Sequence, residues 1–171
     1  EIPPYIIGDP VISLPPPPSG CEDAAALLAG NGDGDLPQGR PHVRGLRDDT
    51  IKLTAKLDFE PFEPLGLTMG AVVAAGEFDL TNTSDEIAVG RGHRSAQDST
   101  VKVFYTNGVQ IQGGMFIPFG GISNGVNLDV ADIVNTTGPQ DIVVGRGPTS
   151  AFGPQVRVYK YVTIPSKSFQ A

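Results

Sequence analysis

The stretch GVNLDVADIVNTTGPQDIVVGRGPTSAFGPQVRVY, residues 125–159, decides the fold because the chain already contains a related copy of it. Moved back by 55 positions, it aligns without a gap with residues 70–104, GAVVAAGEFDLTNTSDEIAVGRGHRSAQDSTVKVF. In this alignment Gly145 falls on Gly90, and both glycines end an apolar run, where we expect a positive φ. Self-similarity at a spacing of this size is typical of repeat architectures.

Each copy contains three short apolar runs separated by turn residues, as expected for β-strands. In the earlier copy the runs are residues 72–75, 87–89 and 101–104. The third run reads Val-Lys-Val-Phe, and this alternation predicts a strand with one face in water. In the later copy, residues 142–144 read Ile-Val-Val without alternation, which predicts a strand covered on both faces.

A fourth strand is predicted to complete each unit. Asn107-Gly108 lies between alternating residues, which is the strongest short-range signal for a β-hairpin turn. It is followed by Val-Gln-Ile-Gln at 109–112 and by Phe-Ile-Pro-Phe at 116–119. In the last copy, residues 161–169 are the expected fourth strand.

An older and more divergent copy is indicated upstream. Its marker is a second Phe-x-Pro-Phe sequence at residues 59–62, and its first run is the Ala-rich segment 24–29. Residues 22–28 also have a weak helical period, but Ala-rich runs of this length occur as buried strands too. Residues 51–53, Ile-Lys-Leu, are predicted to parallel Val-Lys-Val at 101–103.

Four-stranded units repeated at this length are typical of β-propeller blades. We therefore predict an all-β chain with three tandem four-stranded antiparallel propeller-type blades, at about residues 21–67, 68–122 and 123–171. Residues 1–20 are predicted to form a separate extended, Pro-rich N-terminal arm.

The motifs, taken in order, resemble the FG-GAP or VCBS-type β-propeller repeat, which is also found in the heads of integrin α subunits. The matching elements are G-V-x-V-A-x-(D/E), an Asx-rich loop, D-(I/E)-(I/V)-V-G-x-G, V-(K/R)-V-(F/Y) and F-x-P-F. The resemblance covers nearly everything from about Cys21 onward and implies the propeller fold. It does not define a function, because the family serves adhesion, lectin, matrix and scaffold roles.

In that family, the loop between the first and second strands often carries D-x-D-x-D-G-x-x-D and holds calcium, a hard cation that takes six to eight oxygen ligands. This chain departs from the pattern in every copy, and the third loop has only Asp132, Asn135 and Asp141. Calcium is therefore a candidate cofactor, and the alternative is that these side chains cap turns. The candidate ligands are Asn31, Asp33 and Asp35 in the first loop and Glu77, Asp79, Asp85 and Glu86 in the second.

Two further features lie in the predicted loops. Asn82 and Asn135 begin N-x-S/T sequences and are candidate glycosylation sites if the host glycosylates secreted proteins. Arg91 and Arg146 lie in Gly-Arg-Gly turns, whose glycine spacing is not that of a phosphate-binding loop. We interpret these two arginines as solvated or as facing an interface.

Composition narrows the function classes. The net charge of -7 argues against nucleic acid or an anionic membrane as the partner, and no run is long enough to insert into a membrane. No sequence pattern of a nucleophile, a metalloprotease or paired catalytic carboxylates is present, so we expect no enzyme activity. The first residue is Glu1, which favours a processed mature chain or a fragment. The length and the high content of Gly and Pro fit a β protein with an extracellular or cell-surface location.

The arm of residues 1–20 contains apolar segments next to four consecutive prolines at 15–18, which predict a stiff polyproline II spacer. The arm is either disordered or supplies a strand that completes a blade of its own chain or of a neighbour. The candidate assembly residues are Tyr5, Ile6, Ile7, Val11 and Ile12.

A propeller closes with four to eight blades, so three blades leave two apolar end faces without a neighbour. We therefore expect a secreted, non-enzymatic structural or adhesive protein. Its expected partner is itself, in a ring or fibre, or another surface protein that completes the propeller. The alternative function is that of a carbohydrate-binding, lectin-type propeller, calcium-dependent or not, with glycans as partners.

Overall fold

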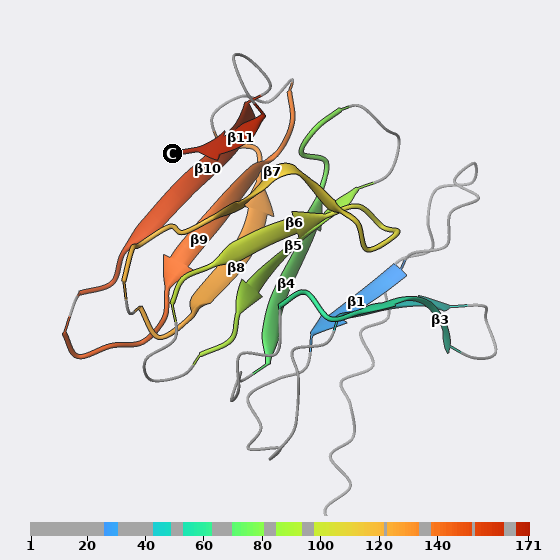
Figure 1. Cartoon of the computed structure of the whole chain (residues 1–171), viewed down its shortest axis with the longest axis horizontal. Helices are drawn as coiled ribbons and strands as arrows, with labels where there is room; N and C mark the ends of the chain where they lie inside the picture. The colour runs from blue at the N-terminus through green and yellow to red at the C-terminus, as the bar shows by residue number, and fades with distance from the viewer. Residues whose placement is uncertain are drawn as a thin grey trace, which may run out of the picture.

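The computed structural model describes residues 26–30, 43–48, 53–62, 70–80, 85–93, 98–121, 123–133, 138–151, 153–162 and 167–171. Within these residues every regular element is a β-strand, and the strands form three antiparallel sheets, as Figure 1 shows. The all-β prediction is therefore confirmed for the part of the chain that is described. Sheet 1 consists of β1 (Ala26–Gly30), β2 (Val43–Asp48) and β3 (Leu53–Phe59).

The other two sheets are four-stranded meanders in which each strand pairs with the next one along the chain. Sheet 2 consists of β4 (Ala71–Gly76), β5 (Glu86–Arg91), β6 (Val101–Phe104) and β7 (Gln110–Phe116). Sheet 3 consists of β8 (Val126–Ala131), β9 (Asp141–Arg146), β10 (Val156–Val162) and β11 (Ser168–Gln170). The first three strands of sheet 3 begin 55 positions after those of sheet 2, as the sequence repeat predicts.

The prediction of four strands in every unit is wrong for the described part of sheet 1, which has three. This copy has no counterpart of the Asn107-Gly108 turn, so β3 runs without a break to Phe59. Beyond Phe59 the chain leaves the sheet, because Phe62 packs among the core residues of sheet 2. β1 also shows that the Ala-rich segment is a strand where it is described, rather than a helix.

The end of β3 also places a charged residue between apolar ones, since Leu57 pairs with Gly45 and Asp58 with Arg44 across β2 and β3. Residues 51 and 52 of the segment predicted to parallel Val-Lys-Val lie outside the described residues, so that part of the prediction stays a prediction.

The predicted hairpin at Asn107-Gly108 is confirmed. Gly108 has a φ of 81° and donates its backbone N–H to the Tyr105 carbonyl at 2.9 Å, while the Tyr105 N–H is 2.9 Å from the Val109 carbonyl. The last copy differs from the prediction, because Tyr161 still belongs to β10 and the fourth strand, β11, contains only three residues.

The glycines at the ends of β5 and β9 do not have the positive φ that we expected. Positive values occur instead at Gly70 and Gly125, immediately before β4 and β8. At Gly90 the missing side chain serves close packing, since a Cβ there would lie 2.3 Å from Cγ2 of Val126 in sheet 3. The requirement for glycine at this position is set by the neighbouring sheet.

The three sheets stack face to face in chain order (Figure 1), and β4 lies between β1 and β8. β7 also contacts β11. Two apolar cores fill the spaces between the sheets. The core between sheets 1 and 2 contains Val43, Phe62, Ala71, Ile87, Val89 and Phe104. The core between sheets 2 and 3 contains Phe78, Ala88, Val101, Val103, Ile111, Val126, Ile142, Val144, Tyr159, Tyr161 and Phe169. The stack is open, so one face of sheet 3 is not covered by a described sheet.

Candidate functional site

The outward face of sheet 3, which we call the open face, is the face of this sheet that no described sheet covers, opposite the face that lies against the core. Side chains alternate between the two faces of a strand. Ile142, Val144 and Tyr159 point into the core against sheet 2, so Val143 and Val158 between them point outward. Both are only half-buried, and they pair with each other across β9 and β10.

The preceding repeat shows how far residues at the positions of Val156 and Val158 are buried when another sheet covers them. Val156 occupies the position of Val101, and Val158 that of Val103. Val101 and Val103 are 0% exposed because sheet 3 covers them, whereas Val156 is 68% exposed. The open face therefore repeats apolar positions that sheet 2 buries against its neighbour.

Charged residues flank these valines. Asp129 on β8 lies beside Val143, and Lys160 lies on β10, two positions beyond Val158. In sheet 2 the corresponding positions are occupied by Ala74 and Tyr105. The open face thus carries valines on β9 and β10, with Asp129 beside them on β8 and Lys160 further along β10. In the row of Val156 the same face carries Gly145 and the exposed Asn127.

The opposite end of the stack has a different surface. Val43 points from sheet 1 into the core against sheet 2, so its strand neighbour Arg44 points to the outward face. Arg44 Nε lies 3.4 Å from Asp58 Oδ2 across β2 and β3, and both side chains are largely exposed. At the two positions described here, the outward face of sheet 1 carries an ion pair in place of apolar side chains.

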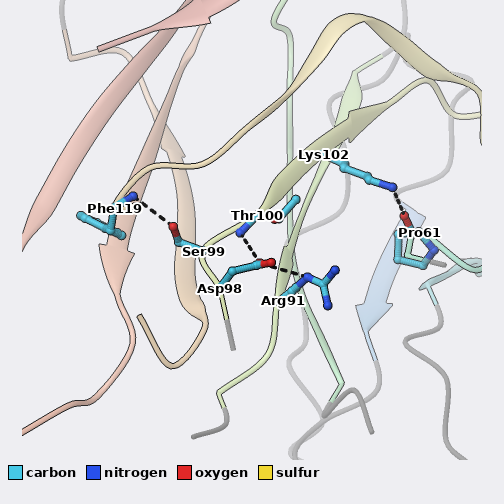
Figure 2. A network of polar contacts seen from close by, with 7 residues as sticks. All are labelled: Pro61, Arg91, Asp98, Ser99, Thr100, Lys102 and Phe119. Atoms are coloured by element: carbon cyan, nitrogen blue, oxygen red, sulfur yellow. Dashed lines mark hydrogen bonds and ion pairs between the residues drawn. The ribbon is translucent and has the colours of Figure 1, made fainter. Parts of the chain in front are cut away.

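The two Phe-x-Pro-Phe segments fasten each sheet to the next one. The Lys102 ammonium donates to the Pro61 carbonyl at 3.1 Å (Figure 2) and lies 5.4 Å from the centre of the Phe62 ring. The Arg91 guanidinium lies over the same ring at 4.9 Å. One segment of sheet 1 is therefore held by two cations of sheet 2.

The same arrangement recurs one repeat later. Arg157 donates to the Pro118 carbonyl, and its guanidinium lies 5.4 Å from the centre of the Phe119 ring. Arg146 lies 5.8 Å from that ring. Arg91 and Arg146, which the sequence indicated to be solvated or to face an interface, each lie over a phenylalanine ring of the preceding sheet in the same chain. The recurring contact is between a cation and a segment of the preceding sheet.

A polar loop before β6 supports this contact in sheet 2. Figure 2 shows Asp98 accepting from Thr100 N at 2.9 Å and lying 3.1 Å from Arg91 Nε. Ser99 Oγ accepts the Phe119 N–H at 3.0 Å, so the end of the second Phe-x-Pro-Phe segment is anchored as well. Asp98 thus holds the Arg91 side chain, and Ser99 holds the backbone of Phe119.

Three of the predicted calcium ligands come together after β4. Carboxylate oxygens of Glu77, Asp79 and Glu86 all lie within 4.8 Å of one another. Glu86 is fully buried and accepts the backbone N–H groups of Phe78 and Asp79 at 2.8 and 3.3 Å. Glu77 accepts the Leu80 N–H at 2.8 Å. These bonds give the cluster a structural role in holding the loop, which is the alternative to calcium binding considered above.

The buried end of this cluster extends to two tyrosines. The Tyr105 hydroxyl donates to Asp79 Oδ2 at 3.0 Å, and the Tyr161 hydroxyl donates to the Gln112 carbonyl at 2.8 Å. Burial raises the pKa of Tyr161, and the charge of nearby Asp79 raises it further. The neutral phenol is therefore the form that the fold favours.

The later copy uses the same loop-holding device. Asp141 occupies the position of Glu86, is buried, and accepts the Ile133 N–H at 3.0 Å. Asp85 is exposed and does not belong to the acidic cluster. Several predicted residues lie outside the described residues and stay predictions: Asn31, Asp33 and Asp35, the sequons at Asn82 and Asn135, and the arm residues Tyr5, Ile6, Ile7, Val11 and Ile12.

Comparison with protein-family models, with curated proteins and with solved structures found no match to this chain. The resemblance to the FG-GAP and VCBS repeat therefore stays a prediction from the sequence. Among the described residues there is no helix long and apolar enough to cross a membrane.

Sequence reasoning placed Lys102 on a face in water, but the structure places it at the contact with sheet 1. The available signal was the spacing between motifs. Lys102 is 41 residues from Pro61, and Arg157 is 39 residues from Pro118. A basic residue that recurs at nearly the same distance after Phe-x-Pro-Phe could have indicated that the two bind each other.

Proposed function

We propose that this chain is a non-enzymatic structural or adhesive subunit that associates through the open face of sheet 3. In this proposal the three sheets are propeller-type blades of an incomplete stack, and the open face is the position where the next sheet belongs. The proposal concerns a structural or adhesive role outside the cell or at its surface, as the sequence resemblance implies.

The observation that carries the proposal is the exposure of Val156. It is 68% exposed, while Val101 at the same position of the preceding repeat is 0% exposed. Burying a valine side chain contributes about 1.5 kcal/mol or more. Val143 and Val158 add to the gain, because a partner on this face would complete their burial.

The buried carboxylates do not favour an enzyme or a metal-dependent function over this one. Glu86 and Asp141 both accept backbone N–H groups from the loops that they hold. A buried charge requires hydrogen-bond partners, and these backbone N–H groups supply them. The two carboxylates can therefore be buried without a metal ion or a catalytic role.

Sedimentation equilibrium over a range of protein concentrations tests the proposal. We expect the wild-type chain to self-associate and Val156→Asp to weaken the association by at least about tenfold, since each lost valine contact is worth about 1.4 kcal/mol or more. Val109→Asp is the matched control, because Val109 is 57% exposed in the β6–β7 hairpin and does not belong to the open face.

Two results would overturn the proposal. One is a wild-type chain that stays monomeric at every concentration, and the other is an association that Val156→Asp leaves unchanged. Equal weakening by Val156→Asp and Val109→Asp would show that added charge is responsible, without any role for the open face.

A further inference from the structure

We propose that residues 5–8 of the N-terminal arm pair with β1 of the same chain and form the first strand of sheet 1. The proposal concerns the end of the stack opposite the open face, and it holds whether or not the chain associates through that face. It is carried by the register of the sheets, which identifies the strand that sheet 1 lacks among the described residues.

The pairing of β1 with β2 repeats the pairing of β5 with β6. In sheet 1, Gly30 of β1 pairs with Val43 of β2. In sheet 2, the corresponding pair is Gly90 of β5 and Val101 of β6. Both valines are fully buried and face the next sheet along the stack. β1 therefore corresponds to β5, the second strand of its sheet.

The outer strand of sheet 1 has the same correspondence. Val43 also pairs with Phe59 on β3, and Val101 pairs with Phe116 on β7. Both phenylalanines begin a Phe-x-Pro-Phe segment. β2 and β3 therefore correspond to β6 and β7, although no Asn-Gly turn joins them. β1, which the sequence indicated as the first strand of its copy, is thus the second, and the missing strand is the counterpart of β4.

The place of this missing strand is the free edge of β1. In sheets 2 and 3 the second strand pairs on both sides, since β5 lies between β4 and β6 and β9 lies between β8 and β10. Among the described residues β1 pairs with β2 alone. An unpaired strand edge presents backbone N–H and C=O groups that an extended segment can bind.

β4 shows the same gap from the side of sheet 2. Ala71 and Val73 contribute to the core between sheets 1 and 2, so Ala75 faces the same way, yet it is exposed. Its counterpart in sheet 3, Val130, is half-buried, and its Cγ1 lies 2.5 Å from where a Cβ of Gly76 would be. The end of β4 thus covers Val130, and the strand that would cover Ala75 in the same way is the one that sheet 1 lacks.

The arm contains a segment with the pattern of a first strand. β4 ends in Ala-Gly followed by Glu at residues 75–77, and β8 ends in Val-Ala followed by Asp at residues 130–132. Residues 7–9 of the arm read Ile-Gly-Asp, again an apolar, a small and an acidic residue, and Tyr5 and Ile6 before them favour strands.

The register of sheet 2 then sets the pairing of the arm. Gly76 pairs with Glu86, and the corresponding partner of Gly8 is Ala26. In this register Ile6 and Gly8 face sheet 2, where Ala75 is exposed, while Ile7 faces outward. The connection at 9–25 has 17 residues against nine at 77–85, but the cost of closing a loop grows only slowly with its length.

Disulfide formation in the full chain tests the pairing. In a Cys21→Ser background, Ile7→Cys is combined with Leu27→Cys, the position opposite, or with Ala29→Cys, two positions further along β1. Directly opposite positions have the Cα separation that a disulfide requires, and the diagonal positions are about 7–8 Å apart. We expect the first pair to form an intrachain disulfide about tenfold faster or more than the second, as measured by mass spectrometry of the dilute, oxidised chain.

Aspartate substitution at neighbouring arm positions gives a second measurement. Ile6→Asp should lower the melting temperature of the dilute chain by about 4 °C or more, because it places a charge against sheet 2. Ile7→Asp, the matched control, should lower it by about 1 °C or less, because this side chain faces water.

Three results would overturn the proposal. Equal rates of disulfide formation in the two cysteine pairs would show that the arm has no fixed register on β1. Melting temperatures that neither aspartate lowers would show that the arm does not pack on sheet 2. A disulfide that links two dilute chains would assign the arm to a neighbour in place of its own chain. None of these results bears on the open face, whose test is the concentration dependence of association.

Discussion

Replacing Gly90 by alanine tests the stacking of sheets 2 and 3. A Cβ at this position would lie 2.3 Å from Cγ2 of Val126 and 3.2 Å from Cδ1 of Leu128. Val126 is fully buried and β-branched, so its side chain has little freedom to move aside. Overpacking of this kind costs about 1–3 kcal/mol, while removing a strand glycine returns about 0.5–1 kcal/mol. We therefore expect a net loss of about 1–2 kcal/mol in the free energy of unfolding.

The repeat supplies a matched control at Gly145, which occupies the position of Gly90 in sheet 3. A Cβ at Gly145 would lie 3.5 Å from Cβ of Asn127, which is an ordinary contact. Gly145→Ala should therefore be neutral or stabilising by about 0.5 kcal/mol in the monomer. Urea unfolding at a protein concentration below the association range measures both variants. Equal effects of the two substitutions would refute the packing argument.

Three other predictions concern the loop, the sheet contact and pH. Glu86→Ala should lower the free energy of unfolding by about 2–4 kcal/mol, because it leaves two buried backbone N–H groups unpaired. Glu86→Gln should lower it less, because one acceptor oxygen remains. Equal losses for the two variants in urea unfolding would contradict the loop-holding role. Phe119→Leu should lower the free energy of unfolding by about 1–2 kcal/mol, since two cations lie over the ring. This loss should disappear in a background in which Arg146 and Arg157 are both replaced by methionine. Because the pKa of Tyr161 is raised in the fold, its contribution to stability is complete below its ordinary pKa of about 10 and is lost as the pH rises through the folded value. The melting temperature of Tyr161→Phe should fall less than that of the wild type at alkaline pH, and parallel curves would exclude this contribution.

The strands of sheets 2 and 3 could be predicted because short-range rules determine them. Alternation identified β6, and the Asn107-Gly108 turn fixed the hairpin that joins it to β7. The 55-residue repeat then transferred these assignments to sheet 3. In the first copy neither the turn nor the exact spacing is present, so the number of strands predicted for it differs from the three strands of the described residues.

The roles of single side chains depended on contacts between sheets, which spacing along one strand does not contain. Lys102 has the sequence pattern of a residue in water, and only the stacked sheet shows that its ammonium reaches Pro61. Glu86 has the pattern of a metal ligand because an acidic residue that binds an ion and one that holds a loop look alike in sequence. Gly90 was assigned to a turn, although its role is to admit Val126.

The most direct test of the association face measures how accessible position 156 is as the protein concentration rises. A Val156→Cys variant in a Cys21→Ser background carries a single thiol on the open face, and Val109→Cys in the same background is the control. We predict that the rate of thiol labelling at position 156 falls when the chain is concentrated, while the rate at position 109 stays constant. Labelling at position 156 that is equally fast at all concentrations would contradict the account.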